Sequence, residues 1–322
     1  MKAFVQQRYG TPEQIELQDV ATPTPGPGEV LVDVQMAGVH IGDVHMMTGK
    51  PYLMRAMGFG VRGPKKRPGS EVAGRVMALG PGVTEFAVGD EVVGIGVGAF
   101  SEVCVAPVQK LIPRPASLSI ENAVALPISG LTALQALRDA GRVKSGDRVL
   151  VIGAAGAVGR YTVQLAKHFD AHVTGLCSGS KMKLVSELGA DEVLDYTAID
   201  AFDGTRSFDL IVDTAGNRPL KVLRRALTRA GTLVIVGSET EESVFGGIDR
   251  VLRAALLSPL IHHRLVGLIS KECASDVQIL CDLAASGVIT PVIDRTYKFE
   301  QVPDAIEYVE SGRSLGKVLV AV

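Results

Sequence analysis

Cysteine is scarce in this chain of 322 residues, and no two cysteines form a CxxC pair. The four are Cys104, Cys177, Cys273 and Cys281. Their scatter excludes a disulfide framework and a structural zinc knuckle, and it is typical of buried or inert thiols in a reducing compartment.

An excess of charge of either sign is also missing. The sequence holds 33 Lys and Arg against 35 Asp and Glu, a formal net charge of −2. Such a balance provides no overall field to attract nucleic acid or another polyanion. The one basic run, "KKR" at 65–67, is interpreted as a solvated loop.

Long apolar runs are absent as well. The most apolar long stretch, 248–270, is interrupted by arginines and by His262 and His263. The start, "MKAFVQQRYG", lacks the apolar core of a signal peptide. We therefore expect a cytoplasmic protein without a membrane partner.

The length and the 47% hydrophobic content suggest about two domains. Residues 1–121 contain short β-rich runs separated by Gly and Pro turns, which predicts a small, mostly β domain. Residues 122–270 alternate short apolar strands with helical segments, which predicts an α/β domain with a parallel sheet that binds a dinucleotide. Residues 271–322 return to mixed texture and are expected to complete the first domain. Helices are expected up to about residue 168, and at 180–188, 219–229, 248–258 and 274–286.

The strongest chemical signal is "VLVIGAAGAVGRYTVQLAKHF", in which a strand runs through a glycine turn into a helix. This arrangement points backbone N–H groups at a pyrophosphate. Ala154 stands at the first position of the usual G-x-G-x-x-G pattern; the alternative is a tight structural turn. The residues predicted to contact the cofactor here are Gly153, Ala155, Gly156, Ala157, Val158 and Gly159.

The end of the next strand indicates which cofactor binds. An NAD site typically has an acid there that binds the ribose 2′-hydroxyl, whereas a 2′-phosphate is bound by hydrogen-bond donors and positive charge. This chain has "CSGSKMK", with Ser178, Lys181 and Lys183 and no acid before Glu187. NADPH is predicted over NADH, and the alternative is that the lysines only solvate a helix.

Several motifs occur together in one order: "AGVHIGDVHMMTGKPY", "PGSEVAGRVMALGPGVTEFAVGDEVVG", "GAFSEVCVAP", "LTALQAL", "GDRVLVIGAAGAVG", "SELGADEVLDY" and "GKVLV". Across essentially its whole length the chain resembles the medium-chain dehydrogenase/reductase superfamily, in its zinc-independent quinone oxidoreductase-like branch. The resemblance implies an α/β protein with a GroES-like β-barrel catalytic domain interrupted by a Rossmann domain.

Zinc-dependent members of that superfamily take ligands from three segments. They carry Cys where His40 stands, His where Ser70 stands, and Cys or Asp in the region that reads "LPISGLTA" here. A catalytic zinc needs three protein ligands, and a serine hydroxyl is a poor substitute for imidazole or thiolate. The four-cysteine loop that holds a structural zinc is missing too. No metal site is predicted.

The resemblance also implies site residues. His40 stands where quinone reductase relatives carry Asn, which suggests a donor near the nicotinamide ribose and substrate; the alternative is a packed loop histidine. Asp43 matches an acidic position and is interpreted as a hydrogen-bond acceptor. His45 is interpreted as structural. Tyr52 is interpreted as a donor at the mouth of the pocket, with a surface aromatic as the alternative. The predicted catalytic group is His40, Tyr52 and Asp43. The remaining predicted cofactor contacts are Thr132, Tyr196 beside Lys181, Gly216 with Asp213 and Asn217, Gly237, Ser238 and Lys317.

These residues favour hydride transfer from NADPH to a quinone or an α,β-unsaturated carbonyl, because an extended acceptor spreads the developing charge and needs few donors. Two alternatives remain: an alcohol dehydrogenase or carbonyl reductase of the same superfamily with a metal at His40, and a non-enzymatic NADPH sensor or structural protein.

Two further interpretations concern surfaces. Segment 51–68 contains Met54 and Met57 and is interpreted as a lid that sets specificity, with a packed helix as the alternative. The strand "RLVGLIS" resembles an edge through which family members dimerise, so a homodimer is expected.

Overall fold

The computed structural model describes residues 1–53, 55–65, 67–237 and 248–322, which divide into two compact units. Unit 1 comprises Met1–Leu131 and Lys271–Val322, and unit 2 comprises Thr132–Ser270. The first boundary falls within helix α3 (Pro127–Gln135), ten residues after the expected 121/122. In the ranges given above, no helix is long and apolar enough to cross a membrane.

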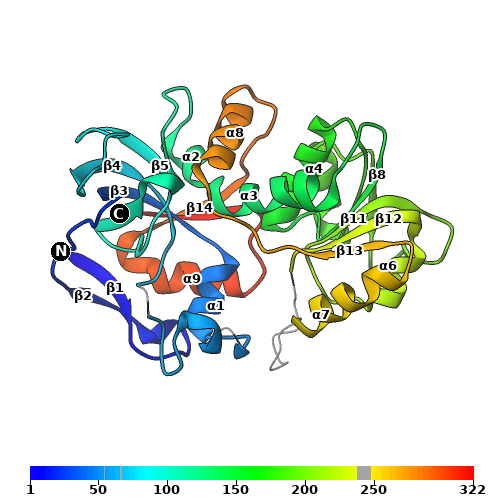
Figure 1. The fold of residues 1–322 in the computed structure, drawn as a ribbon, viewed down its shortest axis with the longest axis horizontal. Coiled ribbons are helices and arrows are strands. Elements are labelled where there is room, and N and C mark those ends of the chain that lie inside the picture. The colour runs from blue at the N-terminus through cyan, green and yellow to red at the C-terminus, as the bar shows by residue number, and fades with distance from the viewer. Residues whose placement is uncertain (54, 66, 238–247) are drawn as a thin grey trace. The chain divides into compact units, whose positions relative to one another are not determined.

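Unit 1 is built mainly on antiparallel strands (Figure 1). In the described residues its larger sheet has the order β14-β15-β3-β4-β5-β7, with β6 also paired to β3, and β1 pairs with β2. The strands are β1 (Lys2–Gln6), β2 (Ile15–Asp19), β3 (Glu29–Val39), β4 (Glu71–Leu79), β5 (Glu91–Ile95), β6 (Val103–Pro107), β7 (Leu111–Pro113), β14 (Ile293–Lys298) and β15 (Lys317–Ala321).

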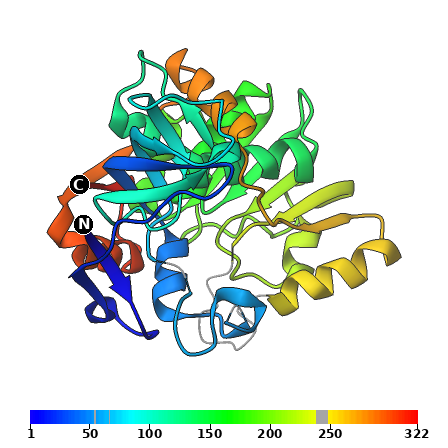
Figure 2. The same cartoon turned by 60° about the vertical axis from the view of Figure 1, so that its left-hand side comes forward.

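The helices of unit 1 are α1 (Ile41–Thr48), α2 (Ile120–Val124), α8 (Ala274–Ala285) and α9 (Val302–Glu310). Helix α1 lies beside α9, the blue and the red helix in both views (Figures 1 and 2). Their apolar faces join the core formed by alternate valines of β3 and β4. Neither α1 nor α9 was expected from the sequence, because each spans only two or three turns and α1 contains Gly42.

Unit 2 is a parallel sheet with strand order β10-β9-β8-β11-β12-β13 in the described part of the chain. Its strands are β8 (Arg148–Ile152), β9 (His172–Cys177), β10 (Glu192–Asp195), β11 (Phe208–Asp213), β12 (Leu227–Ile235) and β13 (Arg264–Gly267). The central strands are continuously apolar because they are buried on both faces. The order reverses between β8 and β11, which is the place where ligands bind such sheets.

The helices of unit 2 are α4 (Ala157–His168), α5 (Met182–Glu187), α6 (Leu220–Arg225) and α7 (Ile248–Leu257). Helices α4 and α5 pack on β8, β9 and β10, whereas α6 packs on β12 and α7 on β13. The helix expected at 219–229 ends early, since Leu227 already pairs with Phe208 as the first residue of β12. The helix expected at 180–188 begins as a 3-10 turn, η5 (Gly179–Lys181).

Short helical turns complete the chain. They are η1 (Pro12–Gln14), η2 (Arg55–Phe59), η3 (Val108–Lys110), η4 (Ala136–Gly141), η6 (Ser258–Leu260) and η7 (Phe299–Gln301), of which η2 and η4 are π-helical.

Candidate active site and cofactor-binding edge

The glycine turn of unit 2 lies between β8 and α4, at the reversal of strand order. Gly153 has φ +77°, and a Cβ on Gly159 would lie 2.1 Å from the carbonyl oxygen of Gly153. Gly156 caps α4 without a side-chain hydrogen bond, so the N–H groups of Ala157, Val158 and Gly159 in the first turn have no intrahelical acceptor. Ala155 is buried within the turn. The residues therefore fit a pyrophosphate at this helix end.

The end of β9 leads into the short turn η5, where Ser178 and Lys181 are both partly exposed. Sequence reasoning missed an acid here: Asp195, the last residue of β10, lies against the turn, and a Cβ on Gly179 would be 2.5 Å from its Oδ2. The Thr197 backbone N–H and hydroxyl donate to Asp195 Oδ1 at 2.9 and 2.8 Å. These bonds hold the pKa of the Asp195 carboxyl below its ordinary value, so it stays ionised and serves the turn.

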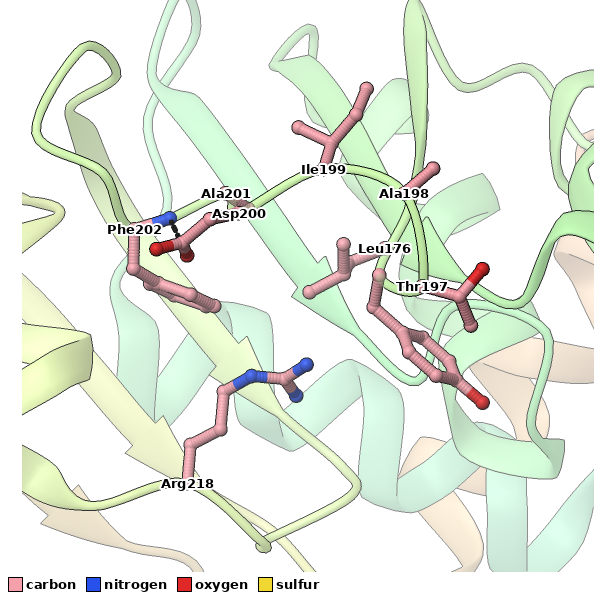
Figure 3. Close-up of a pocket in the computed structure, with 9 residues that line it drawn as sticks. Leu176, Thr197, Ala198, Ile199, Asp200, Ala201, Phe202 and Arg218 are labelled. Atoms are coloured by element: carbon pink, nitrogen blue, oxygen red, sulfur yellow. Dashed lines mark hydrogen bonds between the residues drawn. The ribbon is translucent and has the colours of Figure 1, made fainter.

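A pocket of about 270 Å³ opens beside this turn (Figure 3). Its lining comes from the end of β9, from the connection after β10, and from Arg218. The Arg218 guanidinium carbon lies 5.3 Å from the ring centre of Phe202 and 6.0 Å from that of Tyr196. Arg218 was missed from the sequence, although a cation directly after "VDTAGN" was the available signal.

Asp213 ends β11 and is fully buried. Its Oδ1 accepts the Gly216 N–H at 3.0 Å, and its Oδ2 accepts from Arg250 Nη2 at 2.5 Å. Asp213 therefore shapes the turn that presents Gly216. Gly237 follows β12, where a Cβ would lie 2.2 Å from the Thr214 carbonyl oxygen, and Thr132 is partly buried on α3. Ser238 lies outside the described residues.

In unit 1, a buried ion pair joins strands far apart in sequence. Lys317 on β15 donates from Nζ to Oε2 of Glu71 on β4, and these residues are 4% and 0% exposed. Glu71 Oε1 accepts the Ile128 N–H at 2.9 Å. Gly38 between them makes room, since a Cβ there would lie 2.5 Å from Glu71 Oε2. In the structure the Lys317 ammonium is bonded to Glu71. The predicted contact of Lys317 with the cofactor therefore stays a prediction.

His40 begins α1 as its N-cap. Its Nδ1 accepts the Gly42 N–H at 3.0 Å, and its backbone N–H donates to Asp43 Oδ2 at 2.9 Å, which closes a capping box. Its Nε2 lies 2.8 Å from Ser70 Oγ, 30 residues away in sequence. The motif is therefore a helix start, and its N-cap His40 is bonded to Ser70, the residue directly before β4. A contact of Asp43 with the ribose or substrate stays a prediction.

Burial dominates the electrostatics of this cluster. Burial lowers the pKa of His40 well below its usual range, and Lys317 and His45 lower it further, so the imidazole is neutral near pH 7. Burial raises the pKa of Asp43 to about 7 against the hydrogen bond from the His40 N–H, and nearby Glu71 raises it too. Burial also raises the pKa of Glu71, although Lys317 opposes this.

Tyr52 is 46% exposed, and its ring stacks on Arg55 with 4.7 Å between the guanidinium carbon and the ring centre. Arg55 also covers the Tyr9 ring at 4.3 Å and donates to the carbonyl oxygens of Gly49 and Thr48 at 2.8 and 3.0 Å. The base of the expected lid is thus anchored. Met54 and the side chain of Met57 lie outside the described residues, so the lid interpretation stays a prediction.

Comparisons with known proteins agree with this architecture. Residues 26–116 match the family described as alcohol dehydrogenase GroES-like domain, and residues 188–320 match the family described as zinc-binding dehydrogenase. A chloroplast envelope quinone oxidoreductase homolog of Arabidopsis thaliana is 30% identical over 95% of this chain and 93% of its own. The mitochondrial NAD(P)H oxidoreductase RTN4IP1 of Bos taurus is 30% identical over 100% of this chain and 89% of its own. The solved quinone oxidoreductase from Coxiella burnetii is 26% identical with a TM-score of 0.84, covering 100% of this chain and 99% of its own.

The donor set tests whether a zinc ion fits. His40 Nδ1 is bonded to the Gly42 N–H and its Nε2 to Ser70 Oγ, a hydroxyl that is a poor zinc ligand. Across the residues that the structure describes, no group of three or more His, Cys, Asp or Glu side chains is arranged to hold a metal ion. These residues do not fit a catalytic zinc. Because its relatives match over nearly its whole length and two family models match its parts, the chain belongs to the medium-chain dehydrogenase/reductase superfamily, in its quinone oxidoreductase-like branch.

Proposed function

We propose that this protein is an NAD(P)H-dependent oxidoreductase that works without zinc, prefers NADPH, and reduces a quinone or an α,β-unsaturated carbonyl. The observation that carries the proposal is the glycine turn between β8 and α4 at the reversal of strand order. The names of whole-length relatives support the reaction class. When bound, the nicotinamide supplies a hydride with its two electrons.

The residues of unit 2 would bind the phosphates and the aromatic base of the cofactor. The first turn of α4 offers backbone N–H groups to the pyrophosphate. Ser178 and Lys181 offer a donor and a positive charge to the 2′-phosphate. Arg218 lines the adjoining pocket with a cation (Figure 3). Tyr196 lines it with an exposed ring, and the pair suits an aromatic base.

The residues of unit 1 would supply the hydrogen-bonding groups that face the substrate. His40 is neutral and fixed at both ring nitrogens, so it can hold a hydrogen bond without changing charge. A quinone or an enone spreads the arriving charge over conjugated atoms and needs less polarisation than a simple ketone. The absence of a fitting metal donor set in the described residues favours these acceptors over simple aldehydes.

The direct test follows cofactor oxidation at 340 nm by chelator-treated protein. An ortho-quinone, a simple enone and an aldehyde are offered separately, each with NADPH and with NADH. We expect turnover of the quinone or enone with NADPH. Activity on the aldehyde alone, restored by added zinc, would support the alcohol dehydrogenase alternative, and the absence of any turnover would support the NADPH sensor.

Cofactor preference is tested by measuring the Kd for NADPH and for NADH in variants of two lysines of one segment. Lys181→Ala is expected to raise the Kd for NADPH about 10- to 100-fold and to leave that for NADH nearly unchanged, because a bond between charged groups contributes about 1.5–3 kcal/mol. Lys183→Ala is the matched control, since its side chain is 89% exposed and pairs with Glu187 at 3.8 Å. Equal losses for both cofactors would contradict the preference for NADPH.

We also propose that two copies of this chain pair through β13. In the described ranges β13 pairs with β12 alone, which leaves one edge of the sheet open. Large apolar side chains are exposed around this edge, namely Leu252, Leu256, Leu260 and Ile269. An open edge beside an apolar patch suits a two-fold contact with an identical copy.

Leu256→Asp places a charge in that patch and is expected to shift the protein from dimer to monomer in analytical ultracentrifugation. Leu256 is 76% exposed, so the substitution leaves the core of unit 2 intact. Val88→Asp, at an exposed apolar residue of unit 1, is the control and should leave the mass unchanged. A monomeric wild-type protein, or a dimer that survives Leu256→Asp, would count against this interface.

A further inference from the structure

The hydrogen bonds around His40 determine which ring nitrogen carries its proton. Nδ1 accepts the N–H of Gly42 at 3.0 Å, so Nδ1 cannot itself carry hydrogen in the neutral ring. The pKa of His40 lies well below its usual range, so the ring is neutral near pH 7 and its one proton is on Nε2. Nε2 therefore donates to Ser70 Oγ at 2.8 Å, and Ser70 is the acceptor.

This assignment frees the hydroxyl hydrogen of Ser70. A serine hydroxyl has one O–H to donate, and its oxygen is already occupied as an acceptor by His40. In the part of the chain that the structure describes, the Ser70 hydroxyl bonds to no other group than His40. Ser70 is only partly buried, so its O–H can reach a ligand.

The surroundings hold this pair in place. Ser70 directly precedes Glu71, whose carboxylate is fixed by Lys317 and by the Ile128 N–H. His40 is fixed by the capping box at the start of α1. The networks of Glu71 and of His40 thus hold the Ser70 oxygen in place before any ligand arrives, and a donor placed in advance stabilises developing charge effectively.

We propose that Ser70 is a catalytic residue whose hydroxyl donates a hydrogen bond to the substrate carbonyl oxygen, and that His40 is the positioning residue that orients it. The inference rests on the proposed reduction of a quinone or an enone. The reduced nicotinamide, when bound, would supply the hydride and its two electrons and would itself be oxidised. As the C–H bond forms at the acceptor carbon, the π electrons move to the carbonyl oxygen, and that oxygen then takes a proton from water.

The pair donates a hydrogen bond but passes on no proton. If Ser70 gave up its hydrogen and took the one on His40 Nε2, the ring would become a buried imidazolate anion with Nδ1 still facing the Gly42 N–H. A buried charge without a partner is costly, so this route is closed. The final proton therefore comes from solvent, and the role of Ser70 is electrostatic.

The test compares Ser70→Ala with Ser70→Thr, which keeps the hydroxyl. Ser70→Ala is expected to lower kcat for the quinone or enone about 10²- to 10³-fold, as for the loss of one oxyanion donor, with an unchanged Kd for NADPH by fluorescence. Ser70→Thr should recover most of the rate. Ser70→Cys, with a weak donor of similar size, should resemble Ser70→Ala and provides a second variant if alanine disturbs the fold.

A second readout does not depend on turnover. The probe 4-nitrophenol reports by its absorbance whether it binds as the phenolate, an oxyanion that a fixed O–H donor favours. Wild-type protein and Ser70→Thr should bind the phenolate at least tenfold more tightly than Ser70→Ala does.

The two readouts separate the two proposals. Equal phenolate binding by wild-type protein and Ser70→Ala, or a kcat within twofold of wild type in Ser70→Ala, would overturn the role of Ser70. If the wild-type protein oxidises NADPH with none of the acceptors offered, yet binds the phenolate through Ser70, the proposed reaction is overturned and the donor assignment remains supported.

Discussion

Replacing Lys317 by methionine is expected to lower the free energy of unfolding of the protein by about 3–5 kcal/mol. The substitution leaves the carboxylate of Glu71 buried without its cation, and Glu71 is 0% exposed. The remaining bond from the Ile128 N–H cannot replace a full positive charge. Urea denaturation followed by circular dichroism measures the loss.

Two further variants show whether the ion pair is responsible. Lys183→Met removes an exposed lysine and should change the free energy of unfolding by less than about 0.5 kcal/mol. The double variant Lys317→Met with Glu71→Gln removes both charges and should recover much of the loss, because an uncompensated charge is the main cost. A loss for Lys317→Met no larger than that of Lys183→Met would contradict the argument.

The Lys317 variant also bears on the cofactor. Because its ammonium is bonded to Glu71 and only 4% exposed, we expect the surviving folded protein to bind NADPH with nearly unchanged Kd. A clear rise in that Kd would instead support the direct contact with the cofactor that the sequence motif "GKVLV" predicts.

Asp43 is expected to lower the stability of the protein as pH rises from 5 to 8, whereas buried His40, whose pKa is lowered, contributes in the opposite direction. Burial raises the pKa of Asp43 from 3.8 to about 7 in the folded protein. A carboxyl with a raised folded pKa contributes its full stability below pH 4 and loses it as pH rises through 7. The whole effect is about 4 kcal/mol, of which about 3 kcal/mol falls between pH 5 and pH 8.

The groups that face Asp43 support this sign. They are His40 at the start of α1, Glu71 on β4, Lys317 on β15 and the backbone of Gly69. His40 is neutral and Glu71 repels the ionised form, whereas Lys317 favours it but is already bonded to Glu71. Burial therefore remains the largest influence on the Asp43 carboxyl.

Asp43→Asn tests the effect because the amide oxygen can still accept the His40 N–H. Urea denaturation at pH 5, 6, 7 and 8 should show that the free energy of unfolding of wild type, relative to that of Asp43→Asn, falls by about 3 kcal/mol, because the contributions of His40 and Glu71 are common to both proteins. Asp195→Asn is the control, since its carboxyl pKa lies below the ordinary 3.8 and titrates outside this window. Parallel slopes for wild type and Asp43→Asn would contradict the prediction.

The sequence predicted the fold class, but it did not predict the short helices of unit 1. Apolar strands alternating with helices predicted the α/β architecture, and the parallel sheet with a glycine turn after β8 confirms it. The short helices were harder: α1 needs the capping box of His40 and Asp43, and α9 needs the core of unit 1 to cover its apolar face. Tertiary packing outweighs weak helix propensity in both.

The acid beside the turn after β9 shows a second limit. The absence of Asp or Glu in "CSGSKMK" favoured NADPH, yet Asp195 reaches the same turn from the next strand. Its bonds to Thr197 commit one carboxylate oxygen to the backbone of its own loop. A local motif cannot reveal a side chain that parallel pairing of β9 and β10 brings alongside.

Local sequence decides the features that depend on neighbours in the chain. These are the strand and helix pattern, the glycines that a tight turn requires, and the lack of competent zinc ligands at two of the three positions that the zinc-dependent relatives use. Folding decides which distant groups meet. His40 reaches Ser70 across 30 residues, and Lys317 reaches Glu71 across 246. Burial then shifts their protonation, because the free energy of a charge depends on the solvent it loses and the partners it gains, and neither is written in the residues on either side.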